Sequence, residues 1–282
     1  MSKRISFKEL VKNYKAVFLD SYGVLKNHRG LIDGVTEIID YIRTAGVIIR
    51  ILTNDASKSP QRQVEKFAKQ GLEGLLSDEI ITSGMMAKMF LEHKIDDGKV
   101  AYLGTNASAS YIIEAKLEPI PVGRVDDTNI EKISAMVFLD DEGFDWNFDI
   151  NATLNLLRKR NIPVIVANSD KIYPVAKNEV SIATGGIAQL VESILGRKFI
   201  HFGKPDSQMF MYAFEQLQEI GNFSRKDILM VGDTLHTDIL GGNKFGVSTL
   251  LVFSGNTQEK HHKMLIKSTG VIPDFVANSI VS

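Results

Sequence analysis

The chain of 282 residues contains no cysteine, which excludes disulfide bonds, thiolate nucleophiles and cysteine-bound zinc or iron–sulfur centres. It has almost no net charge, because 33 Lys and Arg face 34 Asp and Glu. A near-neutral chain has no overall attraction to nucleic acid or anionic lipid. No apolar run reaches the roughly 18 residues of a membrane span. We therefore expect neither nucleic acid nor a membrane as partner, and any metal must be bound by oxygen or by His.

The basic N-terminal stretch MSKRISFKELVKNYK is not followed by an apolar segment. A secretory signal peptide would have one. We therefore expect a cytoplasmic protein.

Hydrophobic residues make up 44% and charged residues 24% of the chain, as in ordinary globular proteins. The length corresponds to about two domains. Short apolar runs alternate with helical patterns, and the runs are continuous, which is typical of strands covered on both faces. The predicted strands are residues 16–20, 47–53, 99–104, 135–140, 163–168, 199–202, 227–232 and 248–253.

Three segments between these strands show the i, i+3, i+4, i+7 apolar spacing of an amphipathic helix. The stripes are Val35, Ile38, Ile39 and Ile42; Ile187, Leu190, Val191 and Ile194; and Phe210, Ala213, Phe214 and Leu217. Alternation of strands and helices predicts an α/β fold with parallel sheets. Ligands of such sheets bind at the carboxyl ends of the strands, so the residues that follow the strands are the candidates for chemistry.

Carboxylates follow two of the predicted strands. Asp20 comes directly after the first strand, beside a turn that Gly23 permits, and can act as a nucleophile or metal ligand, or simply cap the turn. Asp233 and Asp238 follow a later strand and can supply oxygen ligands to Mg²⁺. Alternatively, Asp238 favours the first turn of a helix through the helix dipole.

Two other strand ends offer groups that suit a phosphate. Thr53 ends the second predicted strand, and its hydroxyl and the amide of Asn54 can bind phosphate oxygens or cap the following helix. Lys204 follows a strand, with Pro205 opening a helix, and its ammonium can neutralise a phosphoryl group or remain solvated.

In this order and on these elements, the motifs resemble the four motifs of the haloacid dehalogenase (HAD) superfamily of phosphohydrolases. The resemblance covers essentially the whole chain and is best to class IIA, the NagD-like branch of p-nitrophenyl and sugar phosphatases. The strings that carry it are LTNDASKS, EIITSG, VANSD, ATGGIAQLVESILGRKFIHFGKP and MVGDTLHTDILGGNKFG.

The resemblance implies a Rossmann-like parallel-sheet core interrupted by an inserted α/β cap domain. Roughly 150 residues separate Asn54 from Lys204, far more than one crossover connection needs. We therefore expect the core at residues 1–84 and 185–282 and the cap at residues 85–184, where it would cover the site and exclude water.

One position departs from the family pattern. Phosphatases of the family usually carry a second Asp two residues after the nucleophile, as general acid and base, and here Tyr22 takes its place. Loss of a positioned acid/base typically costs about 10²–10⁴-fold in rate. The metal site would survive, because the family uses the backbone carbonyl at this position. The resemblance thus implies Mg²⁺ bound by Asp20, the Tyr22 carbonyl and Asp233, with Asp238 ligating or holding a bound water.

The resemblance implies a phosphatase of small phosphorylated metabolites. Asp20 would attack phosphorus to give an aspartyl-phosphate, with Tyr22 in the acid's place. The phosphate oxygens would be held by Thr53, the backbone around Asn54, and Lys204, and Asp55 is a further candidate for binding the substrate or its phosphate. A weakly active or non-catalytic phosphometabolite binder is one alternative. A haloacid dehalogenase-like hydrolase is another, because those enzymes carry Tyr at this position.

The cap would supply the substrate-facing loop, around residues 171–177. Asn168 and Asp170, just before it, can shape this loop or serve only as turn residues. Caps of this branch often mediate dimers, so a homodimer through the cap is a further expectation.

Overall fold

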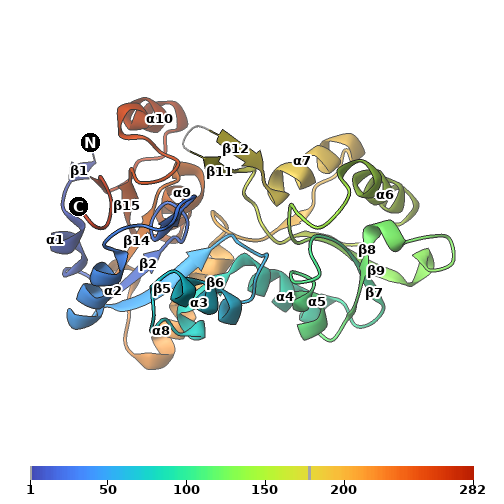
Figure 1. The fold of residues 1–282 in the computed structure, drawn as a ribbon, viewed down its shortest axis with the longest axis horizontal. Helices are drawn as coiled ribbons and strands as arrows, with labels where there is room; N and C mark the ends of the chain where they lie inside the picture. Colours follow the sequence, from blue (N-terminus) through green and yellow to red (C-terminus); the bar gives the residue numbers. More distant parts are fainter. Residues whose placement is uncertain (1, 177–178) are drawn as a thin grey trace. The chain divides into compact units, whose positions relative to one another are not determined.

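Two compact units make up the protein, shown in the computed structural model in Figure 1. The structure describes residues 2–176 and 179–282. The first unit comprises residues up to 53, residues 60–81 and residues from 204 onward; the second comprises residues 54–59 and 82–203. The chain therefore passes between the units at 53/54, 59/60, 81/82 and 203/204.

The second unit differs from the expected 85–184 insertion at its C-terminal boundary, because residues 185–203 belong to it. Helix α7 (Thr184–Leu195) packs Ile187, Ala188 and Val191 into the hydrophobic core of this unit. Strand β13 (Ile200–His201) pairs in parallel with β10 (Val164–Val166) of the same unit. The expectation that residues 185–203 belong to the first unit is therefore wrong. The sequence motifs identify residues with chemical roles and not residues that pack together.

The first unit is built on a seven-stranded sheet in the order β1-β16-β15-β14-β2-β5-β6. Every neighbouring pair from β1 to β5 is parallel. The strands are β1 (Lys3–Arg4), β2 (Ala16–Leu19), β5 (Ile48–Thr53), β6 (Ile80–Thr82), β14 (Ile228–Gly232), β15 (Ser248–Val252) and β16 (Phe275–Ala277). A small hairpin pairs β3 (Lys26–Asn27) with β4 (Gly30–Leu31).

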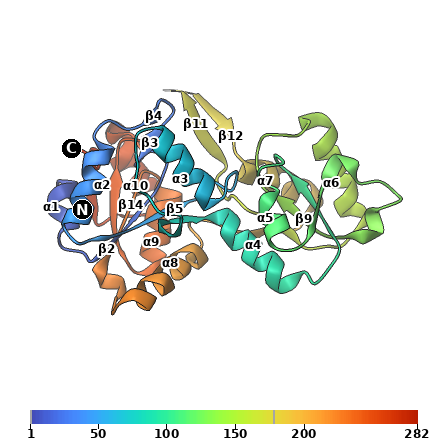
Figure 2. The same cartoon turned by 60° about the horizontal axis from the view of Figure 1, so that its bottom comes forward.

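Both faces of this sheet are covered, as continuous apolar strands require. Val17 and Leu19 of β2 share a core with the buried stripe of α2 (Val35–Thr44). Phe18 points to the other face, where its ring lies 6.5 Å from that of Phe210 on α8 (Ser207–Ile220). Figure 2 shows these elements beside the sheet.

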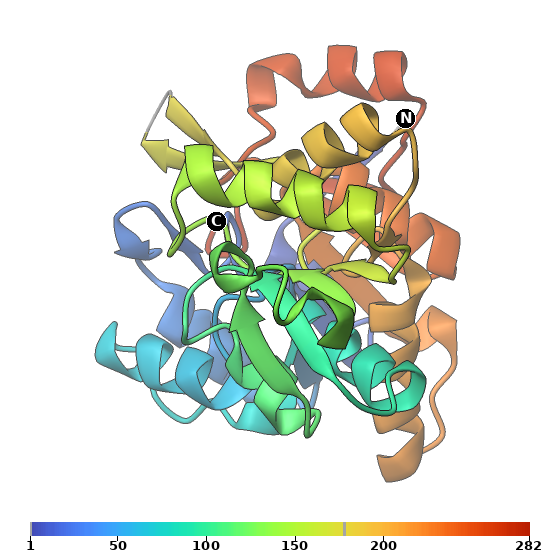
Figure 3. The ribbon, with the colours of Figure 1, turned by 90° about the vertical axis from the view of Figure 1, so that its right-hand side faces the viewer.

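The second unit has its own parallel sheet, in the order β13-β10-β9-β7-β8. Its remaining strands are β7 (Lys99–Leu103), β8 (Glu118–Pro121) and β9 (Ile133–Phe138), and β11 (Ile172–Ala176) forms an antiparallel hairpin with β12 (Glu179–Ile182). Figure 3 shows α6 (Trp146–Lys159) and α7 lying on the same side of this sheet, where they share one core.

The remaining helices are short to medium in length. They are α1 (Phe7–Val11), α3 (Pro60–Lys69), α4 (Ser83–Lys94), α5 (Ser110–Glu114), α9 (Leu240–Phe245) and α10 (His262–Thr269), with single turns η1 (Ser77–Glu79), η2 (Val122–Arg124), η3 (Ile130–Lys132), η4 (Arg225–Asp227), η5 (Leu235–Ile239) and η6 (Glu259–His261). Within the described residues, none of the helices combines the length and apolarity needed to cross a bilayer.

The α/β prediction with parallel sheets is confirmed, but two local expectations are wrong. Leu190 and Ile194 are 50% and 58% exposed, because α7 turns Ala188 and Glu192 inward instead. Glu192 is drawn inside by accepting a hydrogen bond from the Phe199 N–H. Helix α8 begins at Ser207, two residues after Pro205, rather than at the proline.

Candidate active site

Three adjacent strands end beside one another and carry the predicted site residues of the first unit. Strand β2 pairs with β14 on one side and β5 on the other. Asp20 directly follows β2, Asp233 directly follows β14, and Thr53 is the last residue of β5. Because all three strands are parallel, these side chains lie at the same edge of the sheet.

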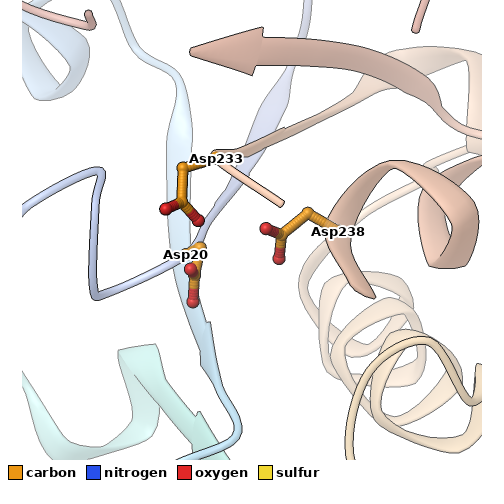
Figure 4. A group of neighbouring side chains, drawn as sticks. All are labelled: Asp20, Asp233 and Asp238. Carbon is orange, nitrogen blue, oxygen red and sulfur yellow. The ribbon is translucent and has the colours of Figure 1, made fainter. Parts of the chain in front are cut away.

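Asp238 joins the group through an unusual turn. The single π-helical turn η5 follows Asp233 and leads directly into α9, and such turns occur frequently at functional sites. Gly232 permits the close approach, because a Cβ there would lie 2.1 Å from the Cβ of Asp238. Asp20, Asp233 and Asp238 each offer an oxygen within 4.8 Å of the others. Figure 4 shows the three carboxylates grouped around one point.

Lys204 links this group to the end of β5. Its ammonium lies 2.6 Å from Asp20 Oδ1 and 2.8 Å from Asp238 Oδ1, and it donates to the Leu52 carbonyl at 2.8 Å. The side chain is 3% exposed, so these contacts are shielded from water. Thus Asp20, Asp238 and Lys204, far apart in sequence, form one buried ionic cluster.

The electrostatics of the cluster leave negative charge uncompensated. Burial raises the pKa of Asp20 well above its usual range, and Asp238 and Asp233 add to this while Lys204 opposes it. Burial and the Asp238 charge raise the pKa of Asp233 to about 7. Burial lowers the pKa of Lys204, but the charges of Asp20 and Asp238 outweigh it, so this pKa lies above its ordinary value.

The donor set therefore fits a divalent cation. Lys204 balances one of the three negative charges of Asp20, Asp233 and Asp238, and a cation among the three carboxylates would balance the rest. An all-oxygen set of a few carboxylates is typical of Mg²⁺ sites, which keep several waters.

Tyr22 lies within the field of the same cluster. Burial and the nearby charge of Asp233 raise the pKa of the Tyr22 phenol above its ordinary value. The phenol is therefore neutral near pH 7 and is a poor base there.

Two residues that the sequence did not single out hold Asp233. The Asn256 N–H donates to Asp233 Oδ2, and the Thr234 hydroxyl donates to Oδ1 at 3.0 Å. Thr234 follows Asp233 directly, so a hydroxyl beside the motif carboxylate is the signal that could have revealed it. No spacing signal connects Asn256 with Asp233, because 23 positions separate them along the chain.

The other predicted site residues lie in the second unit. Asn54 Nδ2 donates to Asp170 Oδ1 at 2.9 Å, and the Asp170 N–H donates to Asn168 Oδ1 at 2.8 Å. Asp55 accepts hydrogen bonds from the N–H and hydroxyl of Ser57. The structure thus joins Asn54 to Asp170, a contact that the sequence did not predict. Residues 172–176 of the expected substrate loop form β11, whereas residue 177 lies outside the described residues.

The sequence matches two families of known proteins. Residues 17–118 match the haloacid dehalogenase-like hydrolases, and residues 201–281 match a HAD-hydrolase-like family. The chain is 24% identical to chronophin from Bos taurus, over 98% of this chain and 94% of that one.

Solved structures resemble the chain over its whole length. A possible sugar phosphatase of the HAD superfamily from Cytophaga hutchinsonii is 50% identical, with a TM-score of 0.97 over 100% of this chain and 99% of that one. A glycerol phosphate phosphatase from Mycobacterium tuberculosis, solved in complex with magnesium, shares the fold. Its TM-score is 0.78 at 20% identity, over 98% of this chain and 77% of that one.

Proposed function

Because the chain belongs to the haloacid dehalogenase superfamily of hydrolases, we propose that it is a Mg²⁺-dependent phosphatase of small phosphorylated metabolites. One observation carries this proposal: Asp20, Asp233 and Asp238 converge at one sheet edge with Lys204 ion-paired between two of them. The HAD-superfamily relative from Cytophaga hutchinsonii, described as a possible sugar phosphatase, supports it.

Asp20 is the proposed nucleophile. One of its oxygens bonds to phosphorus as the bond to the leaving-group oxygen breaks, and water then attacks the aspartyl-phosphate to release inorganic phosphate and regenerate Asp20. Asp20, Asp233, Asp238 and the Tyr22 carbonyl would hold Mg²⁺. When bound, the ion offsets the negative charge that the carboxylate and the phosphate bring together.

Lys204 has two proposed tasks. Its ammonium orients Asp20 through the 2.6 Å contact, and its positive charge stabilises the equatorial phosphate oxygens. Thr53, at the end of the neighbouring strand, would donate its hydroxyl to the same phosphate. Both residues are on or beside rigid elements, which favours precise positioning.

The second unit is the proposed source of substrate selection. Asn168 and Asp170 hold each other at the end of β10, and Asp170 accepts from Asn54. We propose that this group and Asp55 shape the substrate side of the enzyme, and that the unit acts as a cap. We also propose a cytoplasmic location and a homodimer formed through this unit. Light scattering after size-exclusion chromatography tests the dimer.

Phosphate release with wild type and Asp20→Asn tests the proposal. We expect wild type to release phosphate from p-nitrophenyl phosphate only with Mg²⁺, and Asp20→Asn to lose at least about 10³-fold in kcat, since the amide is a poor nucleophile. An Asp206→Asn variant, which changes an exposed acid near Lys204 in sequence, serves as the matched control.

Other outcomes select the alternatives. Binding of phosphorylated metabolites without turnover in wild type would support a phosphometabolite binder. Halide release from a 2-haloacid without metal would support a dehalogenase. Equal activity of wild type and Asp20→Asn would contradict the aspartyl-phosphate route.

A further inference from the structure

The loop that follows β15 lies against both aspartate-bearing strand ends of the first unit. A Cβ on Gly255 would lie 1.9 Å from Asp233 Oδ2 and 2.7 Å from the Cα of Gly23, so only glycine fits there. The Ser254 hydroxyl donates to the Gly23 carbonyl at 2.6 Å, and the Thr257 N–H donates to the Asp233 carbonyl at 3.1 Å. Residues 254–257, here called the β15 loop, therefore join the turn after β2 to the residue after β14.

The β15 loop also orients the Asp233 side chain. Asn256 donates its backbone N–H to Oδ2, while its side-chain Nδ2 donates to the Thr234 hydroxyl at 2.9 Å. The Thr234 hydroxyl in turn donates to Oδ1 at 3.0 Å. A hydroxyl has one proton, so accepting from Asn256 leaves that proton for Asp233. The result is one directed chain from amide to hydroxyl to carboxylate.

This chain of hydrogen bonds opposes the electrostatic repulsion between two carboxylates. Oxygens of Asp233 and Asp238 lie within 4.8 Å of each other, and like charges at this distance repel, which favours rotation of an unrestrained Asp233 carboxylate away from Asp238. Each oxygen that accepts one hydrogen bond keeps a further lone pair for a cation.

We propose that Thr234 and Asn256 are positioning residues that fix the Asp233 carboxylate in its cation-binding orientation. The proposal rests on the proposed function, because it places a divalent cation at Asp233. Hydrogen-bond partners of metal ligands typically change metal affinity or activity by about 10–100-fold when removed. Asn256 is exposed, so water can replace part of its donation, and its effect falls below that range.

Isothermal titration of the protein with MgCl₂ alone tests the proposal without relying on turnover. We expect Thr234→Val, which keeps the shape but removes the hydroxyl, to weaken Mg²⁺ binding about tenfold, and Thr234→Ser to stay within about twofold of wild type. Asn256→Ala should weaken binding about threefold. Because Asn256 acts through the hydroxyl, adding Asn256→Ala to Thr234→Val should cost less than about twofold more.

Controls separate positioning from folding. Asn13→Ala removes an exposed amide elsewhere in the first unit and should leave Mg²⁺ affinity unchanged. Melting in EDTA should show each variant within a few degrees of wild type, so that any loss is specific to the metal. A variant that melts earlier but binds Mg²⁺ as wild type does would show a merely structural role.

The outcomes distinguish this proposal from the proposed function. Unchanged Mg²⁺ affinity in Thr234→Val, or effects of Thr234→Val and Asn256→Ala that multiply, would overturn the positioning role even if the enzyme releases phosphate. The expected order of affinities without phosphate release from any substrate would retain the positioning role and reject the phosphatase. A wild-type protein that binds no Mg²⁺ overturns both.

Discussion

Asp20 shows how far the chemistry of one residue depends on its surroundings. Burial and the two neighbouring carboxylates raise the pKa of Asp20 well above its usual range, which favours the protonated acid, and a protonated acid is a poor nucleophile. Lys204 opposes that protonation, and a bound cation would do so more strongly. The residues that matter most around Asp20 are thus those that control its charge.

With Tyr22 in place of the usual Asp, we expect the rate to depend strongly on the leaving group of the substrate. A phenol with a raised pKa is a weak proton donor near neutral pH, so substrates whose leaving group needs a proton should react slowly. Tyr22→Asp should raise kcat/KM for a sugar phosphate about 10²-fold relative to p-nitrophenyl phosphate. Steady-state kinetics on both substrates measure this ratio.

The matched control is Tyr22→Phe, which removes only the hydroxyl and should behave as wild type on p-nitrophenyl phosphate. If Tyr22→Asp leaves the ratio of the two substrates unchanged, the account of Tyr22 as a missing acid/base is wrong.

The raised pKa of Asp140 leads us to expect that the stability of the second unit depends on pH. Burial, then the neighbouring Asp141 charge, raise the pKa of Asp140 to about 6, although the Thr105 hydroxyl donates to it at 3.1 Å. A raised folded-state pKa means that ionisation destabilises the fold, so stability falls as pH rises from about 4 to 6. Asp140→Asn should stabilise the protein by about 1 kcal/mol above pH 7, after allowance for solvent screening, and have little effect near pH 4.

Urea unfolding of wild type and Asp140→Asn at the two pH values gives this difference directly. An equal difference in the free energy of unfolding at both pH values would show that ionisation of Asp140 does not destabilise the fold.

At the scale of elements, the packing of α4 on α5 depends on one glycine. A Cβ at Gly84 of α4 would lie 2.4 Å from the ring of Tyr111 on α5. That ring is fixed, because its hydroxyl donates to the Lys58 carbonyl at 2.7 Å and lies 2.8 Å from the Thr82 hydroxyl. The glycine is thus a packing requirement rather than a flexible joint.

Gly84→Ala should therefore destabilise the protein, although alanine favours a helix interior over glycine by about 1 kcal/mol. Overpacking against a ring that cannot move costs about 1–3 kcal/mol and outweighs that gain in most of its range. Thermal unfolding measures the sign. With Tyr111→Leu added, the double variant should lose less stability than the sum of the losses in the two single variants. A Gly84→Ala variant more stable than wild type would contradict the steric argument.

The elements that the sequence predicted share one property, namely continuous apolar runs. All eight predicted strands are found, with shifts of a few residues at their ends. Strand β8 was missed because it contains Pro119 and Pro121, and prolines are tolerated at the sheet edge where β8 lies. The hairpin of β11 and β12 was missed because its exposed strands lack a buried run.

The sequence predicted those site residues that have a chemically active side chain and also lie in a recognisable sequence motif. Asp20, Lys204, Asp233 and Asp238 were expected together and lie together. The contribution of Asn256 could not be predicted, since a backbone N–H that reaches a distant carboxylate leaves no trace in residue type. The Asn54–Asp170 contact likewise depends on how the chain returns after more than one hundred residues.

At the scale of the whole molecule, the true boundaries of the second unit make a prediction about fragments. Residues 82–203 should fold cooperatively alone, whereas residues 85–184 should not, because they lack Ile187, Val191 and Phe199 of the core. Each such side chain contributes about 1.5–3 kcal/mol on burial, and together they rival the whole stability of a small domain.

Circular dichroism with thermal melting of the two fragments checks this prediction. A cooperative transition in the shorter fragment would mean that α7 and β13 are dispensable for the second unit.

The passage of residues 54–59 into the second unit bears on recombination between related enzymes. A chimera that replaced residues 82–203 alone would keep the host's Asn54 and Lys58, whose partners Asp170 and Tyr111 would come from the donor. Those two hydrogen bonds would then join residues that had not evolved together. If the second unit selects the substrate, as proposed, then transferring its specificity takes two separate pieces of gene, and the shorter one begins immediately after Thr53.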